Sequence, residues 1–137
     1  MKEKTYIMVK PHFANFQEVI DDVKDEVYNA DLEIIEEKFV RYSVKDAQKH
    51  YAEHFRGSYE NAKGFYKELE DYITSDKAYG MVIVGEDAIA KMRAIIKRLR
   101  QEIPVMLGEA PRMTENVLHG SDCAESANNE IEIFKNL

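Results

Sequence analysis

The segment from Asn116 to Ile131, NVLHGSDCAESANNEI, combines residue types that could do chemistry. Its one histidine, His119, comes directly before Gly-Ser-Asp and a stretch of helical character. A neutral imidazole can act as a nucleophile near pH 7, because its unperturbed pKa is only about 6.5. The local pattern alone favours a purely structural interpretation. Asp122 followed three residues later by Glu125 is a capping-box pattern, in which a carboxylate accepts from the first helical turn.

A basic stripe in the segment 86–100 is the second candidate. This segment carries five basic residues against two acidic ones, in a chain whose formal net charge is −7. If the segment is helical, Arg93, Lys97 and Arg100 share one face, since they are spaced four and three residues apart. Such a stripe on an acidic protein suggests a small anionic ligand. The alternative is a solvated helix face whose cations lie favourably near the helix C-terminus.

The string HYAEH, from His50 to His54, matches the H-x-x-E-H pattern of one class of zinc peptidase. In that class two histidines one turn apart hold the metal and the glutamate handles a proton. A five-residue match on an ordinary polar helix is weak evidence, and the chain is short for a peptidase cleft with a distal third ligand. We therefore expect exposed helix histidines rather than a metal site.

Length and composition predict a single domain over residues 1–137, large enough to bury a core without staples. The acidic balance argues against a protein that coats nucleic acid. No apolar run approaches the roughly 20 residues of a membrane span, and no charged-then-apolar leader precedes Thr5. The single cysteine, Cys123, agrees with a reducing compartment. We expect a cytoplasmic protein with neither nucleic acid nor membrane as partner.

Strands and helices alternate along the chain. The expected strands are about 4–10, 32–42 and 79–84, with a short one running into His119. The expected helices are one opened by the capping box Asn15–Glu18, one opened by Ser43–Asp46, one over about Lys63–Thr74, the basic helix of 86–100, and one after Asp122. An irregular stretch with Pro104, Gly108 and Pro111 separates the basic helix from the last strand. This order predicts an α+β fold with a ferredoxin-like βαββαβ core, an antiparallel four-stranded sheet covered by helices.

Several motifs occur together and in a set order along nearly the whole chain. They are VKP at 9–11, HYAEH at 50–54, KGFY at 63–66, GEDAIAKMR at 85–93, NVLHGSD at 116–122, and a glutamate eleven residues after His119. Together they resemble the nucleoside diphosphate kinase family, and Asn-x-x-His-Gly-Ser-Asp is the most specific part. The resemblance implies a phosphotransferase that moves the γ-phosphate of a nucleoside triphosphate to a nucleoside diphosphate through a phosphohistidine. The alternative is a nucleotide-binding or protein-interaction module of the same fold with little transfer activity.

The resemblance also implies catalytic roles for five residues. His119 resembles the family's phosphate-accepting histidine, and Glu130 the glutamate that holds its other ring nitrogen. Ser121 matches the hydroxyl that supports this pair. Lys10 and Tyr51 match residues that face the transferred phosphate.

Further residues match the family's nucleotide contacts. Arg93 resembles the arginine that grips phosphates, Asn116 the asparagine that contacts the sugar, and Phe65 the aromatic that stacks on the base. Mg²⁺ would be carried by the nucleotide phosphates, so we expect no metal ligand from the protein. The resemblance further implies a homo-oligomer, a hexamer or a tetramer.

Three segments depart from the family pattern. The family's Lys-Pro is normally followed by Asp-Gly, whereas His12 and Phe13 follow here, so that turn must be rebuilt. The segment 55–62, FRGSYENA, looks like an insertion. The loop after Arg93, which normally carries a threonine and a second arginine on the phosphates, is not recognisable. Arg112 is our first choice for that arginine and Arg100 the second, because Arg100 lies two turns along the helix, roughly 10 Å from Arg93.

Overall fold

The computed structural model describes residues 2–51, 63–109 and 117–137, without the side chains of 63–66. In chain order the elements are β1 (Lys2–Val9), the 3-10 turn η1 (Phe13–Asn15), α1 (Gln17–Asn29), β2 (Glu33–Val40), α2 (Val44–Tyr51), α3 (Lys63–Thr74), β3 (Ala78–Glu86), α4 (Ala88–Met106), β4 (Leu118–Gly120) and α5 (Ala124–Lys135). Within the described ranges, no helix has the length and apolar character needed to cross a membrane.

The four strands form one sheet in the order β2-β3-β1-β4, and each neighbouring pair is antiparallel. Helix α1 connects β1 to β2 across the intervening strand β3, and α4 connects β3 to β4 across β1. Both connections are therefore split βαβ units, the arrangement of a ferredoxin-like core. The α+β class and the four-stranded antiparallel sheet predicted from the sequence are confirmed.

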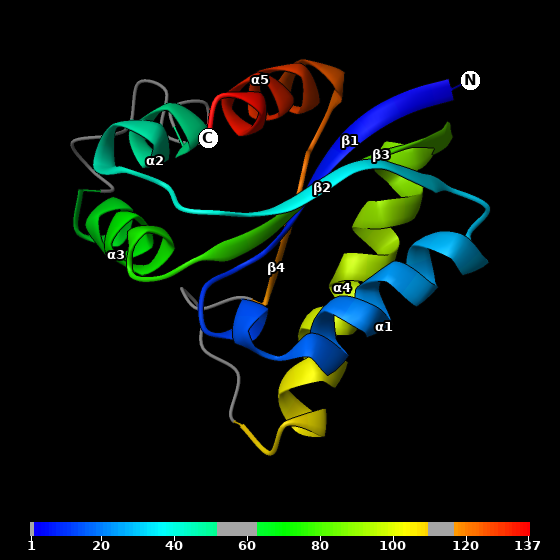
Figure 1. Ribbon diagram of the computed structural model, residues 1–137, viewed down its shortest axis with the longest axis horizontal. Helices are drawn as coiled ribbons and strands as arrows, with labels where there is room; N and C mark the ends of the chain where they lie inside the picture. The colour runs from blue at the N-terminus through cyan, green and yellow to red at the C-terminus, as the bar shows by residue number, and fades with distance from the viewer. Residues whose placement is uncertain (1, 52–62, 110–116) are drawn as a thin grey trace.

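Helices cover both faces of the sheet. Figure 1 shows α1 and α4 on one side of the strands and α2, α3 and α5 on the other. Central strand β1 serves both layers because successive side chains point to opposite faces. Ile7 and Val9 pack with α1 and α4, whereas Tyr6 and Met8 pack with α2, α3 and α5.

The short edge strand β4 follows the same alternation. Leu118 lies in the core beneath α1 and α4, and His119 is paired in register with Met8 of β1. Gly120 lies directly under α4, where an added Cβ would come within 2.4 Å of the Cδ1 atom of Ile96. A side chain at position 120 would therefore require the end of the Ile96 side chain to move, and glycine lets Ile96 of α4 pack directly on β4.

One of the three predicted capping boxes forms. The Ser43 hydroxyl accepts from the Asp46 N–H at 3.1 Å, and the Asp46 carboxylate accepts from the Ser43 N–H at 3.2 Å. The capping box predicted at Asn15 is wrong, because Phe16 is the N-cap of α1 and the Asn15 amide donates to Asp76 instead. The one predicted at Asp122 is also wrong, because Cys123 is the N-cap of α5.

Helix α4 continues past the point where the sequence predicted an irregular stretch. Pro104 lies inside the helix and is buried together with Ile103, so packing against the core outweighs the one N–H that proline lacks. The helix ends two residues later, at Met106, in a Schellman motif. Gly108 has a φ of 73°, its N–H donates to Val105, and the N–H of Glu109 donates to the carbonyl of Pro104.

Candidate active site

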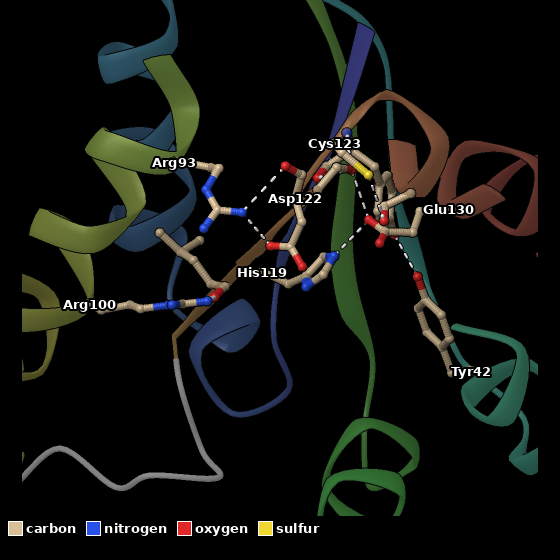
Figure 2. A network of polar contacts seen from close by, with 11 residues as sticks. Tyr42, Arg93, Arg100, His119, Asp122, Cys123 and Glu130 are labelled. Carbon is tan, nitrogen blue, oxygen red and sulfur yellow. Dashed lines mark hydrogen bonds and ion pairs between the residues drawn. The ribbon is translucent and has the colours of Figure 1, made fainter. Parts of the chain in front are cut away.

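The imidazole of His119 is held by a carboxylate from the neighbouring helix. Its Nε2 lies 2.7 Å from Oε1 of Glu130 on α5, and both side chains are buried. An ionised carboxylate can only accept, so Nε2 carries the proton in this bond and the neutral ring keeps its lone pair on Nδ1. Figure 2 shows the Nε2 edge of the His119 ring, from β4, facing the carboxylate of Glu130, from α5.

Ser121 connects this pair to the central strand. Its hydroxyl donates to the same Oε1 of Glu130 at 2.8 Å and accepts from the N–H of Tyr6 at 3.1 Å. The N–H of Ser121 in turn donates to the carbonyl of Tyr6 at 3.2 Å. Glu130 is thus fixed by two donors on or beside β4, which limits the orientations open to the ring of His119.

His50 is part of this cluster, and the expectation of an exposed helix histidine is wrong for it. Its side chain is only 1% exposed, and its ring lies 4.6 Å from that of His119, centroid to centroid. The buried face of α2 packs onto the sheet at the place where His119 emerges from β4, so His50 is enclosed there. His54 and the glutamate of the HYAEH string lie outside the described residues.

His50, His119 and Glu130 also have the ligand types of a metal site, with ligand atoms within 4.8 Å of one another. Oε1 of Glu130 already accepts from His119 and from Ser121. We therefore interpret the group as a hydrogen-bonded histidine and carboxylate with an aromatic packing partner.

Tyrosines complete the wall around the two histidines. Tyr51, the last residue of α2, is buried with its ring 4.8 Å from that of His50. The hydroxyls of Tyr6 and Tyr42 lie 2.8 Å apart, and burial raises the pKa of both. Both phenols therefore stay neutral and act as hydrogen-bonding groups at ordinary pH.

Lys10 lies at the end of β1, beside the chain that leads into β4. Its N–H donates to the carbonyl of Val117 at 2.9 Å, and its side chain is 4% exposed. Burial, with a smaller contribution from Arg100, lowers the pKa of Lys10 to about 7. Within the described part of the chain, no carboxylate pairs with its ammonium group.

The turn after Lys10 is rebuilt, as its sequence predicted. His12 has a left-handed backbone conformation with a φ of 71°, which is unusual for a residue other than glycine. Its Nε2 donates to the carboxylate of Glu109 at 2.7 Å, which ties this turn to the end of α4. Strained backbone of this kind often lies at functional sites.

The basic stripe of α4 lines a pocket beside β4. The pocket has a volume of about 450 Å³ and is lined by Arg93, Ala94, Ile96, Lys97, Arg100, Gly120 and Asp122. Arg93 donates to the carboxylate of Asp122 at 2.5 Å, and Arg100 donates twice to the carbonyl of Leu118. Figure 2 shows both arginines extending from α4 toward the segment that carries His119 and Asp122. The shared face is confirmed, and two helical turns do not prevent Arg93 and Arg100 from lining one pocket.

Comparison with known proteins agrees with this geometry. The family model described as "Nucleoside diphosphate kinase" matches residues 3–136. The chain belongs to the nucleoside diphosphate kinase family. Among curated members, the nucleoside diphosphate kinase of Bacillus licheniformis is 37% identical over 136 residues, which cover 96% of this chain and 87% of that protein. That of Helicobacter pylori (strain P12) is 33% identical, over 98% of this chain and 96% of its own length.

Solved structures of nucleoside diphosphate kinases have the same fold. The Aquifex aeolicus enzyme superposes with a TM-score of 0.78 at 26% identity, covering 98% of this chain and 95% of its own. The Halobacterium salinarum enzyme in complex with CDP gives 0.77 at 28% identity, covering 98% and 88%. The family resemblance read from the sequence is confirmed.

The structure describes some of the residues that match family site positions and not others. The structure brings together six residues that the sequence selected: Lys10, Tyr51, Arg93, His119, Ser121 and Glu130. Phe65 lies in the first turn of α3, but its side chain is not described. Arg112 and Asn116 lie outside the described residues. Sequence reasoning missed the burial of His50, and its one signal was that HYAEH follows a capping box on an amphipathic helix.

Proposed function

We propose that the chain is a nucleoside diphosphate kinase that carries the γ-phosphate of a nucleoside triphosphate on His119 and delivers it to a nucleoside diphosphate. Family membership supports the reaction class. The bond between His119 and Glu130 supports the mechanism, because it directs the Nδ1 lone pair away from the carboxylate. A nucleotide-binding module without transfer is not favoured, since the histidine, its carboxylate and the supporting serine are all in contact.

In the first half-reaction, Nδ1 of His119 attacks the γ-phosphorus. A P–N bond forms while the bond from phosphorus to the bridging oxygen breaks, and the nucleoside diphosphate leaves with that electron pair. The Nε2 proton stays in the bond to Glu130, whose negative charge offsets the positive charge that develops on the ring. In the second half-reaction, a terminal oxygen of another nucleoside diphosphate attacks the phosphorus. The P–N bond then breaks and the ring is neutral again.

Cationic side chains offset the charge of the transferred phosphate. Lys10 and Arg93 are in the places where the family pattern has phosphate-binding residues, and both lie beside the segment with His119. Mg²⁺ would arrive on the nucleotide and neutralise part of the phosphate charge. The pocket supports this role of a substrate-borne metal, because its described lining offers one carboxylate, Asp122, which Arg93 already holds.

Other parts of the assignment rest on the sequence and on the family resemblance that it carries. We propose that Tyr51 faces the transferred phosphate, that Phe65 stacks on the base, and that Asn116 and Arg112 contact sugar and phosphate. We further propose that residues 1–137 form one domain, that the protein is cytoplasmic, and that it assembles as a hexamer or a tetramer.

A pulse-chase experiment tests the two half-reactions. The protein is incubated with [γ-³²P]ATP and Mg²⁺, separated from nucleotide, and then mixed with unlabelled GDP. We expect acid-labile label on the protein after the first step and labelled GTP after the second. Label that GDP does not remove, or GTP formed only while ATP is present, would contradict a phosphoenzyme that lies on the reaction path.

A further inference from the structure

The backbone of His12 is strained at a point where glycine would be relaxed. Its φ of 71° and ψ of −61° are those of a classic γ-turn, a rare and costly conformation for a residue with a side chain. Glycine adopts a positive φ without this cost, so a turn of this shape does not by itself require histidine. The contacts of the His12 side chain must therefore hold the conformation in place.

The side chain of His12 is held by a carboxylate and by two aromatic rings. Its Nε2 lies 2.7 and 2.9 Å from the two carboxylate oxygens of Glu109. Its ring packs edge-on against Phe13 and Phe16, at 4.8 and 5.5 Å between centroids. Glu109 is itself fixed, because its N–H donates to the carbonyl of Pro104 in the motif that ends α4. The His12–Glu109 pair thus connects the turn after β1 to the C-terminal end of α4.

The simplest alternative is that this pair only stabilises the fold. Its two side chains are 45% and 37% exposed, and exposed ion pairs contribute little to the free energy of unfolding because water and salt screen them. The strained backbone of His12 works against even that small contribution. A weak surface pair beside a strained residue is therefore better explained as a device that fixes one local conformation of the turn.

Lys10 begins this turn, and the burial of its ammonium group depends on the path that the turn takes. The carbonyl of Lys10 accepts from the N–H of Ala14 at 3.0 Å, which closes the turn into a ring. One side of the ring is anchored to α3, because the hydroxyl of Tyr72 donates to the carbonyl of Pro11 at 2.6 Å. His12 is the next residue and carries the anchor to α4, so a change at His12 alters the direction in which the chain leaves Lys10.

We propose that His12 and Glu109 are positioning residues, and that the bond between them holds the turn in the conformation that keeps the Lys10 ammonium group buried beside the segment with His119. The proposal rests on the phosphotransfer proposed for His119, in which Lys10 faces the transferred phosphate. Misplacing a catalytic group by about 1 Å can cost roughly 100-fold in rate. A weak surface pair can therefore matter more for transfer than for stability.

Three variants of the full chain test this proposal. Glu109→Ala removes the partner of His12, and Glu109→Gln keeps an oxygen that can accept from Nε2. Asn15→Ala is the matched control, because the Asn15 side chain donates to Asp76 at 3.2 Å from the same turn and alanine keeps the backbone N–H. We expect phosphoenzyme formation at saturating ATP to slow at least about fivefold in Glu109→Ala and to stay within about twofold of wild type in the other two.

The ionisation of Lys10 is the measurement that a merely structural role would not change. Burial lowers the pKa of Lys10 to about 7, and NMR of the lysine side chains can follow its titration. In Glu109→Ala we expect this pKa to rise toward its ordinary range, because the ammonium group gains contact with water. Glu109→Gln and Asn15→Ala should keep the wild-type value. An unchanged Lys10 pKa in Glu109→Ala, or equal losses of rate in Glu109→Ala and Glu109→Gln, would overturn the proposal.

A substitution at His12 separates positioning from stability. His12→Gly removes both the strain and the bond to Glu109, so its thermal midpoint should equal or exceed that of wild type while phosphoenzyme formation slows at least about fivefold. A lower midpoint or an unfolded variant, with activity lost in proportion, would assign the pair to stability and overturn the proposal. Failure of the proposed function is distinguishable, because a protein that takes up no ³²P label would still show the change in the Lys10 pKa.

Discussion

The ring of His50 lies against the ring of His119, 4.6 Å between centroids and with 66° between the planes. This contact gives the first histidine of HYAEH a packing role in the active site. His50→Ala should lower the free energy of unfolding by about 2–5 kcal/mol, the usual range for truncating a large buried side chain to alanine. It should also slow phosphoryl transfer, because His119 loses the neighbour that limits the orientations of its imidazole ring. Thermal unfolding and single-turnover labelling check the two effects, and wild-type values in both would contradict the packing role.

Glu130 should matter for transfer and not for binding. In Glu130→Gln the amide oxygen can still accept from Nε2 of His119, but no negative charge offsets the ring as it becomes cationic. We expect phosphoenzyme formation to slow by about 10- to 1,000-fold, the range for losing a positioned partner in catalysis. ADP affinity, measured by calorimetry, should hardly change. A variant that binds ADP poorly yet transfers phosphate normally at saturation would show that Glu130 contributes to nucleotide binding instead.

The local sequence was sufficient to predict the strands and helices. It was not sufficient to predict the contacts between distant residues, such as that of His50 with His119. Strand alternation in 4–10 and helical spacing in 86–100 depend on near neighbours, so the order of strands and helices could be predicted. The place of His50 depends on which face of α2 the sheet covers and on a histidine 69 positions later. No pattern within a short window contains that information.

Competition between distant partners explains the failed caps. Asp122 and Glu125 have the correct spacing for a capping box, but Arg93 offers the Asp122 carboxylate a cationic donor from α4. The family motif was more informative at this site, because it selected His119, Ser121 and Glu130 together. It did not assign Arg100 a definite place, since the part of the chain after Arg93 departs from the family pattern.

Nucleotide binding should take up a proton at Lys10. In the free protein its pKa is lowered to about 7, so the side chain is largely neutral at pH 8. A bound phosphate favours the charged form and raises this pKa, so affinity should fall as pH rises above about 7, by up to about tenfold per unit. Calorimetry of ADP binding at pH 8 in buffers of different ionisation enthalpy measures the uptake. Uptake of equal size in Lys10→Met would show that another group titrates.

Asp122 should compete with phosphate for Arg93. Both side chains of the pair are about half exposed, at 53% and 52%, so the bond is worth about 0.2–1 kcal/mol. Asp122→Asn should therefore lower KM for the nucleoside triphosphate by up to about fivefold. Glu102→Gln, which removes a partner of Arg98 on the same helix, is the matched control and should leave KM unchanged. A higher KM in Asp122→Asn would mean that Asp122 positions Arg93 for phosphate.

The most direct test of the account is to locate the phosphate on the protein. Wild-type protein and His119→Gln are treated with ATP and Mg²⁺, freed of nucleotide, and compared by ³¹P NMR and peptide mapping at alkaline pH. We predict one phosphate per wild-type chain, bonded to Nδ1 of His119, and none on His119→Gln, which should keep its fold and its affinity for ADP. Phosphate on Nε2, on another residue, or at equal level on His119→Gln would contradict the central claim.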